Sequence, residues 1–296
     1  VGIKSHYVLI RSGEDERDIP TDFPNASYFN HAICAVPLGK DTTWLECTSQ
    51  TVAPGYMGSA TGNRHALLIT ENGGILVKTP VYGKSENQYN SRVEATLNKE
   101  GQLSIEANNR YKATLGELYH HLIHQLSTEE KQKFLQRALD LPQYTIRAFD
   151  YKETPGDIPV IDEQLSITAD HYAQFTGKRL FIVPNVLNKW EHKLTADTNR
   201  LFDIILNEEK IEIDTVRISL PEGYKIERDL KVNQLNTPFG SYEVSTQIQN
   251  NTVLYIRRME LNKGRFPAKM YNELLLFYEK IYNADRAKLV FVKEEA

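Results

Sequence analysis

The sequence predicts a mainly β protein with some helix, of the α+β class. Short stretches in which apolar and polar residues alternate recur along the chain, most plainly at residues 93–97 and 103–107, on either side of the turn Lys99-Glu100-Gly101. Pro and Gly residues separate these stretches at short intervals, which is typical of antiparallel strands joined by turns. Helical spacing is confined to residues near 115–140 and 268–283.

The individual elements follow from the same patterns. We expect a hairpin over residues 30–47 and another over 66–78, and further strands at 7–10, 145–151, 165–168, 178–183, 211–220, 242–249, 253–261 and 288–292. The first helical segment breaks near Ser127, where Ser127-Thr128-Glu129-Glu130 has the order of a capping box. Pro267 opens the second segment, because Pro is favoured in the first helical turn.

Composition excludes several classes of function. The chain has 296 residues, 35 Lys plus Arg, 39 Asp plus Glu and a net charge of -4, so it carries no positive excess that would hold a nucleic acid. No apolar run approaches the roughly 18 residues that a membrane-spanning helix needs. With about 150 residues per domain as a guide, the length suggests two domains.

The segment around His31 is the most informative for chemistry. Glu46 lies on the expected hairpin partner strand, and a carboxylate beside an imidazole can fix its tautomer, as in a nucleophile–base–acid triad. A turn centred on Leu38-Gly39 would place His31 opposite Glu46, whereas a turn centred on Lys40 would shift the register. From spacing alone, a His and a Glu on a solvated hairpin are the favoured explanation of the pattern.

Separated segments in the first part of the chain carry a resemblance to a known superfamily. They are Val1-Gly2-Ile3-Lys4-Ser5-His6-Tyr7-Val8-Leu9-Ile10, Phe29-Asn30-His31-Ala32 and Trp44-Leu45-Glu46-Cys47-Thr48, followed by a Gly-rich loop from Gly55 to Gly62 and by Leu76-Val77-Lys78-Thr79-Pro80. In this order they resemble the later half of the transglutaminase-like superfamily of papain-type cysteine enzymes. The match is closest to bacterial multi-domain proteins in which such a core is flanked by β-sandwich domains. It covers about the first 80 residues.

The resemblance implies a domain organisation and a set of site residues. Residues 1–82 would be the C-terminal half of a transglutaminase-like core, and residues 83–296 an antiparallel β-sandwich or barrel domain with helical insertions. His31 matches the base, Glu46 matches the orienting acid, where the superfamily has Asp, and we expect Trp44 to contact the substrate. The superfamily's nucleophilic Cys lies on a helix that precedes the segment beginning at Val1, so we expect no nucleophile in this chain.

The two cysteines are not expected to replace that nucleophile. On a strand successive side chains alternate between faces, so Cys34 points away from His31 and Cys47 away from Glu46. We interpret both as buried structural thiols.

Two functions from different classes follow. The resemblance implies the C-terminal fragment of a cysteine peptidase, amidase or transglutaminase that acts on amide bonds by acyl transfer and is inactive alone. The alternative is a non-catalytic β-sandwich module that binds protein or glycan and whose triad is degenerate, which Glu46 in place of Asp favours.

Partners and location are implied by the resemblance alone. We expect a protein or peptide substrate, or a glycan, with no cofactor, and an exported protein that is periplasmic or at the cell surface. The strand at residues 7–10 must pair either later in this chain or in a preceding segment. If it lacks a partner, the exposed sheet edge would favour association between copies of the chain.

Two weaker patterns complete the survey. His120, His121 and His124 form an H-H-x-x-H cluster in which the outer pair shares a helix face, but no third ligand is apparent, so we interpret it as a polar helix face and expect no metal. Arg257 and Arg258 are interpreted as part of a solvated strand edge.

Overall fold

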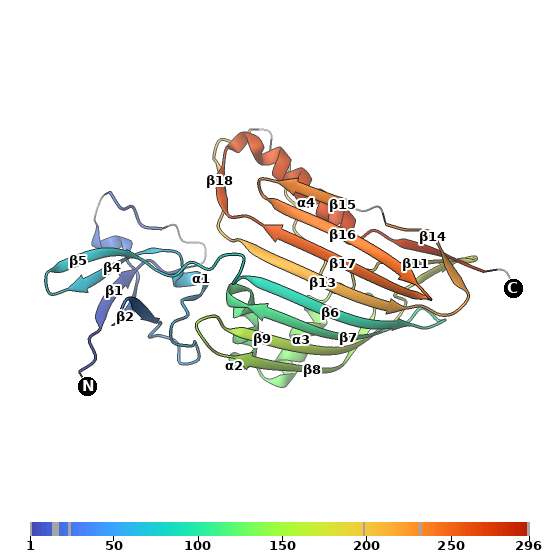
Figure 1. Cartoon of the computed structure of the whole chain (residues 1–296), viewed down its shortest axis with the longest axis horizontal. Helices are drawn as coiled ribbons and strands as arrows, with labels where there is room; N and C mark the ends of the chain where they lie inside the picture. The colour runs from blue at the N-terminus through green and yellow to red at the C-terminus, as the bar shows by residue number, and fades with distance from the viewer. Residues whose placement is uncertain (1, 14–17, 23–24, 198, 231–232, 295–296) are drawn as a thin grey trace. The chain divides into compact units, whose positions relative to one another are not determined.

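The computed structural model describes residues 2–13, 18–22, 25–197, 199–230 and 233–294, so Val1, the first residue of the resemblance, lies outside the described residues. The structure is mainly β with some helix, which confirms the predicted fold class. The chain divides into two compact units, each built from separate stretches of sequence (Figure 1). Unit 1 comprises residues 1–87, 111–125 and 153–161, and unit 2 the remainder. The domain boundary expected near residue 82 stays a prediction.

Unit 1 contains a five-stranded antiparallel sheet. Its strands are β1 (His6–Ile10), β2 (His31–Leu38), β3 (Asp41–Leu45), β4 (His65–Thr70) and β5 (Gly73–Lys78), in the order β3-β2-β1-β4-β5. The first strand therefore lies in the middle of the sheet and finds both partners later in this chain. Of the two alternatives considered from the sequence, the structure shows pairing later in this chain, and β3 and β5 are the edges of the sheet. Self-association through an edge stays a prediction.

One face of this sheet is buried. Because side chains alternate along a strand, the core of unit 1 draws on every second residue of neighbouring strands. Its members are Val8, Ile10, Ile33, Ala35, Trp44 and Ala66, together with Met57 from the Gly-rich loop. His31 lies on this face, since it follows the same alternation as Ile33 and pairs with Ile10 in β1.

The helices of unit 1 are short. They are α1 (Gly58–Thr61), within the Gly-rich loop, and α2 (Glu117–Gln125), which is preceded by a 3₁₀ turn at Ala113–Gly116. A further 3₁₀ turn, Ala26–Tyr28, precedes β2.

Unit 2 is dominated by an eight-stranded sheet in the order β15-β16-β17-β13-β6-β7-β9-β8 (Figure 1). The strands are β6 (Gln88–Leu97), β7 (Leu103–Lys112), β8 (Tyr144–Thr154), β9 (Val160–Ala169), β13 (Lys210–Ser219), β15 (Asn233–Thr237), β16 (Gly240–Gln249) and β17 (Thr252–Leu261). β13 runs antiparallel to β17 but parallel to β6, so the sheet is mixed where an antiparallel one was expected.

A four-stranded sheet, β10-β11-β19-β14, shares the core of unit 2. Its strands are β10 (Gln174–Thr176), β11 (Arg179–Ile182), β14 (Tyr224–Arg228) and β19 (Leu289–Lys293), and a small ribbon pairs β12 (Ile204–Leu206) with β18 (Gly264–Phe266). Leu180 and Phe291 from the four-stranded sheet join Ile105, Ile218 and other residues of the large sheet in one apolar cluster. Two sheets thus contribute side chains to one core.

Two helices add to this core. They are α3 (Thr128–Ala138), through Leu135, and α4 (Tyr271–Asp285), through Leu274, Phe277 and Ile281. The capping box at Ser127 is confirmed, since the Ser127 hydroxyl accepts from the Glu130 amide and Glu130 accepts from the Ser127 amide. A 3₁₀ turn at Ala268–Met270 follows Pro267, so α4 begins a few residues later than expected.

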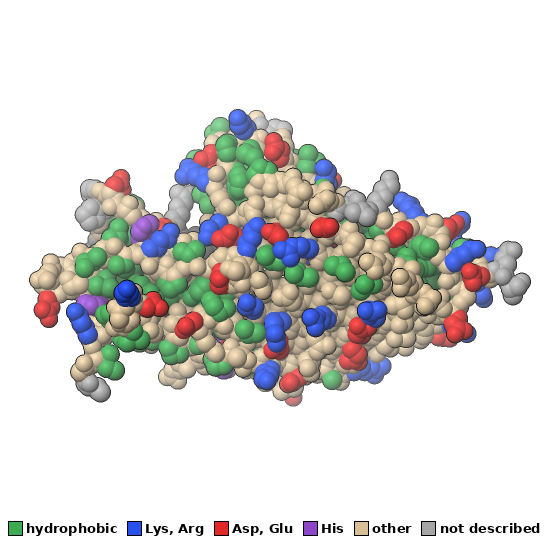
Figure 2. Space-filling view, in the orientation of Figure 1, with side chains coloured by type: hydrophobic (Ala, Val, Ile, Leu, Met, Phe, Trp, Pro, Cys, Tyr) green, Lys and Arg blue, Asp and Glu red, His purple; other side chains and the backbone are tan. Residues whose placement is uncertain are grey.

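Arg257 corrects one of the sequence interpretations. Its side chain is fully buried and forms ion pairs with Glu212, Asp214 and Asp285, whereas Arg258 is 44% exposed. Figure 2 shows Lys, Arg, Asp and Glu side chains interspersed over the face that it draws. Within the described part of the chain, no helix is both long enough and apolar enough to span a membrane.

Candidate functional site

His31 and Glu46 lie side by side in unit 1. Nε2 of His31 lies 2.9 Å from Oε1 of Glu46 and 3.0 Å from Oε2. The two side chains are 19% and 14% exposed. The hairpin therefore brings together the two residues that the sequence singles out, and the carboxylate holds Nε2 while Nδ1 remains the nitrogen that can exchange a proton with another group.

The register of the hairpin differs from both registers considered from the sequence. Leu38 pairs with Asp41, so the turn consists of Gly39 and Lys40. The last pair joins Cys34 to Leu45, and Glu46 follows it. Glu46 thus reaches His31 diagonally along one face of the sheet.

The start of β2 is fixed by the residue before His31. Asn30 accepts a hydrogen bond from the Ser12 amide at 2.7 Å and donates one to the Ser12 carbonyl oxygen at 3.0 Å. The Asn30 amide also donates to the Ile10 carbonyl oxygen at 3.2 Å. These bonds tie the beginning of β2 to the chain that leaves β1, and so set where His31 stands on the sheet.

Thr48 completes the surroundings of the carboxylate. Its hydroxyl donates to Oε1 of Glu46 at 2.7 Å, and its amide donates to the same oxygen at 3.1 Å. Burial raises the pKa of Glu46, but the Thr48 hydroxyl, the His31 hydrogen bond, the Thr48 amide and the charge of His31 together outweigh it and lower the pKa. Glu46 is therefore held as a carboxylate, the form that can support an imidazolium.

Trp44 is buried, whereas a residue that contacts substrate would be exposed. It pairs with Ala35 across the hairpin and is 8% exposed within the core of unit 1. Its substrate-binding role stays a prediction, and in the structure the indole supports the sheet that carries His31.

The cysteines differ from their expected burial. Cys47 is exposed, with its thiol donating to the Leu45 carbonyl oxygen at 3.5 Å, and Cys34 is half-buried. The expectation that both are buried is wrong. Cys34 in β2 and Cys47 just after β3 both continue the alternation of their strands on the face opposite to the core. That alternation also turns Cys34 away from His31, as expected.

The Gly-rich loop is held by Glu117 of α2. The Glu117 carboxylate accepts hydrogen bonds from the Tyr56 hydroxyl at 2.6 Å, the Ser59 amide at 2.8 Å and the Ser59 hydroxyl. Burial, followed by the charge of Glu117, raises the pKa of Tyr56, so the phenol stays protonated and donates. Sequence reasoning missed Glu117, because it is more than fifty residues from the loop.

A second His–carboxylate pair lies in unit 1 and was also missed. Nδ1 of His65, at the start of β4, lies 2.6 Å from Oδ2 of Asp18, and the side chains are 34% and 36% exposed. His65 precedes Ala66, whose side chain lies in the core, so its own side chain points to the opposite face from His31. It makes a matched control for His31.

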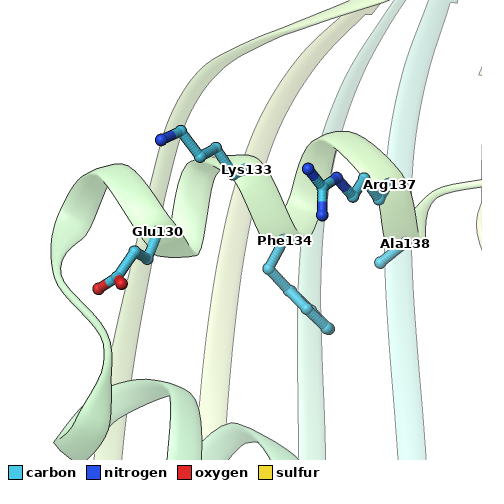
Figure 3. Close-up of a pocket in the computed structure, with 5 residues that line it drawn as sticks. All are labelled: Glu130, Lys133, Phe134, Arg137 and Ala138. Atoms are coloured by element: carbon cyan, nitrogen blue, oxygen red, sulfur yellow. The ribbon is translucent and has the colours of Figure 1, made fainter.

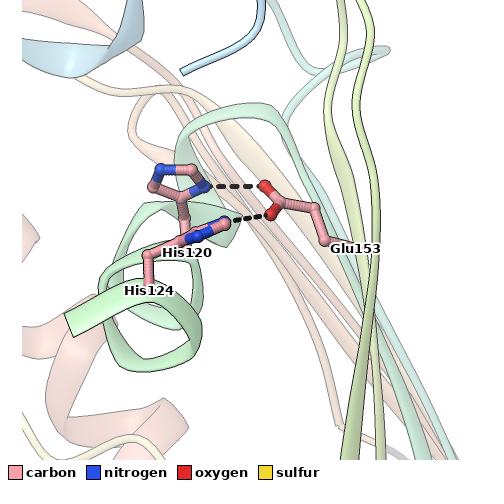
Figure 4. Close-up of side chains that lie close together, drawn as sticks. All are labelled: His120, His124 and Glu153. Carbon is pink, nitrogen blue, oxygen red and sulfur yellow. Dashed lines mark hydrogen bonds and ion pairs between the residues drawn. The ribbon is translucent and has the colours of Figure 1, made fainter. Parts of the chain in front are cut away.

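The outer pair of histidines on α2, His120 and His124, gains a third candidate ligand. Glu153, near the end of β8, contacts both His120 and His124 (Figure 4). Neither spacing nor periodicity could have indicated Glu153, which lies 29 residues after His124.

A surface hollow in unit 2 lies along α3. Its volume is about 430 Å³ and it is lined by Glu130, Lys133, Phe134, Arg137 and Ala138 (Figure 3). Because one short helix supplies this whole lining, the hollow brings no residues of different elements together.

The family model that matches this chain covers residues of unit 2 alone. Residues 178–291 match the model of a family described as a domain of unknown function with a solved structure, DUF3858. No curated protein matches the chain. The crystal structure of a candidate protease from Parabacteroides distasonis is similar over 98% of this chain, with 14% sequence identity and a TM-score of 0.47. This chain spans 40% of the length of that protein. The region from β11 to β19 therefore resembles the DUF3858 family, and His31 and Glu46 lie outside the matched region.

Proposed function

We propose that this chain supplies the base and the orienting acid of a transglutaminase-like cysteine peptidase or amidase, with the nucleophilic cysteine provided from outside residues 1–296. The contact between Nε2 of His31 and both carboxylate oxygens of Glu46 carries the proposal. The sequence resemblance supplies the reaction class.

In this proposal each nitrogen of His31 has its own role. With Nε2–H donating to Glu46, Nδ1 carries the lone pair that can take the proton of a thiol. The resulting thiolate attacks the carbonyl carbon of an amide, and Nδ1–H then gives the proton to the departing amine as the C–N bond breaks. Water or a second amine resolves the thioester, with His31 again accepting a proton. Throughout, the Glu46 carboxylate stabilises the imidazolium.

Alone, the chain is proposed to lack acyl-transfer activity. Cys34 and Cys47 are its only cysteines, and neither shares the face on which His31 and Glu46 lie. The chain nevertheless holds the pair of groups that makes a thiol reactive at neutral pH.

The test uses the protein encoded by the complete reading frame that contains this chain. If a cysteine at a helix N-terminus precedes residue 1, its alkylation by iodoacetamide near pH 6 is expected to be faster than that of a free thiol. His31→Ala is expected to slow it by on the order of 100-fold, since the imidazolium no longer favours the thiolate. Glu46→Gln is expected to slow it less, because the imidazole remains.

His65→Ala is the matched control, because it removes a second His–carboxylate pair from the same sheet and is expected to leave the alkylation rate unchanged. Equal rates in wild type and His31→Ala, or no upstream cysteine at all, would overturn the proposal. Both of those results would favour the non-catalytic binding module.

A further inference from the structure

The cluster formed by His120, His124 and Glu153 is made of metal-ligating atoms. The two histidines are one turn apart on α2, with ring centroids 4.5 Å apart. Nδ1 of His120 lies 2.7 Å from Oε1 of Glu153, and Nε2 of His124 lies 2.6 Å from Oε2. Figure 4 shows both rings directed from the helix toward the one carboxylate. All three residues belong to unit 1.

We propose that His120, His124 and Glu153 form a three-ligand site for a divalent transition-metal ion of the zinc type, with a fourth position open to water. Two imidazole nitrogens and one carboxylate oxygen are a ligand set that zinc adopts in sites of this open kind. The site does not depend on the function proposed for His31.

The spacing of the ligand atoms fits such an ion. One potential ligand atom from each residue can be chosen so that all three lie within 4.8 Å of one another. An ion with bonds of about 2.0–2.1 Å in tetrahedral geometry would hold its ligand atoms ~3.3 Å apart. The hydrogen-bonded atoms would therefore separate by roughly 0.6 Å as the ion replaces the shared protons, and the widest pair of ligand atoms would close by up to about 1.5 Å, through rotation of the side chains.

Thr51 contacts the ring nitrogen of His120 that would not bind the metal, and metal-bound histidines commonly have a hydrogen-bond partner at that nitrogen. Its hydroxyl lies 2.9 Å from Nε2 of His120, the nitrogen that does not face Glu153. When Nε2–H donates to this hydroxyl, the lone pair of Nδ1 faces the carboxylate. Two facing groups of lone pairs repel unless a cation lies between them, so this tautomer favours the ion.

The exposure of the cluster supports the same assignment. The side chains of His120, His124 and Glu153 are 21%, 31% and 16% exposed. An ion can therefore enter from solvent, and water can reach the fourth position.

The experiment measures binding of zinc chloride to the whole chain, freed of metal with a chelator, by isothermal titration calorimetry. Wild type is expected to bind one equivalent. His124→Ala and Glu153→Gln are each expected to raise the Kd by on the order of 100-fold, and Thr51→Ala by about 10-fold, as an outer contact does. Far-ultraviolet circular dichroism establishes that each variant is folded.

His121→Ala is the matched control, because His121 is an exposed histidine on the same helix that does not belong to the cluster. It is expected to leave the Kd and the stoichiometry unchanged. Cobalt chloride gives a second readout, since four-coordinate cobalt absorbs visible light strongly and the hydrated ion only weakly. Wild type and His121→Ala are expected to show the strong band, and His124→Ala is expected to lack it.

Three results would overturn the proposal. One is the absence of saturable zinc binding to wild type. Another is an equal loss of affinity in His121→Ala and His124→Ala, which would mean that exposed histidines bind zinc without a defined site. The third is a cobalt spectrum that matches the hydrated ion.

Discussion

Nε of Arg257 lies 2.9 Å from Oδ1 of Asp285, and both side chains are fully buried. The contact joins β17 to the last residue of α4. Asp285 also accepts from the Tyr242 hydroxyl and from the Trp190 amide, each at 2.8 Å. The attraction within a buried ion pair offsets the free-energy cost of desolvation only when the remaining hydrogen-bonding groups of the pair have partners. Tyr242 and Trp190 are such partners for Asp285.

Removing Arg257 is expected to destabilise the fold strongly. Arg257→Ala leaves Glu212, Asp214 and Asp285 without their common cation, and breaking a buried pair in this way costs about 3–5 kcal/mol. The measurement is the free energy of unfolding in urea. Arg258→Ala, one residue along the strand, removes an exposed pair with Glu260 and is expected to cost about 0–1 kcal/mol. Similar losses in the two variants would show that burial of Arg257 contributes little.

Asp214 is expected to make stability depend on pH. Burial raises its pKa to about 7, with the Glu212 carboxylate adding to the shift and Arg257 opposing it. Unfolded, its pKa is about 3.9, so between about pH 4 and 7 the folded chain holds more protons at this site than the unfolded chain. The contribution of Asp214 to the free energy of unfolding therefore falls as pH rises through this window.

Asp214→Asn tests this dependence, because the amide cannot ionise. The decrease in the free energy of unfolding between about pH 5 and pH 8 is expected to be smaller in the variant than in wild type. Urea unfolding at both pH values gives the comparison. An identical decrease in the two proteins would contradict the prediction.

Glu46 is expected to make the free energy of unfolding depend on pH in the opposite direction. Its pKa is lowered in the folded chain, so its contribution to stability is present above its unfolded pKa of about 4.3 and is lost as pH falls through the folded value. Glu46→Gln is expected to lower the free energy of unfolding near pH 7, and this difference is expected to shrink below about pH 4. Glu71→Gln, in the exposed turn between β4 and β5, serves as the control and is expected to change little at either pH.

Glu117 is expected to control the order of the Gly-rich loop. Glu117→Ala leaves the Tyr56 hydroxyl and the Ser59 amide without their acceptor, at a cost of about 1–3 kcal/mol. Hydrogen exchange of the Ser59 amide is expected to become faster, since its protection depends on this bond. Glu129→Ala, on the exposed first turn of α3, is the control. Unchanged exchange at Ser59 in the Glu117 variant would contradict the assignment.

The sequence by itself determined those features that arise from neighbouring residues. Alternation located β6, β7, β13, β16 and β17, because each strand has one buried face and a period of two. The capping box at Ser127 was readable because its partners are three residues apart. The contact between His31 and Glu46 could be predicted because one hairpin carries both residues.

The tertiary structure decided where distant residues meet. It made Arg257 a core residue. Alternation along β17 puts this position on the buried face, but an Arg is stable there only because its partners Asp214 and Asp285 come from elements far away in the sequence. The tertiary structure also placed β13 parallel to β6, and it brought Glu153 to His120 and Glu117 to the Gly-rich loop. Each of these contacts closes a long loop, so its free energy comes from packing and charge pairing in the folded chain, and no local pattern records it.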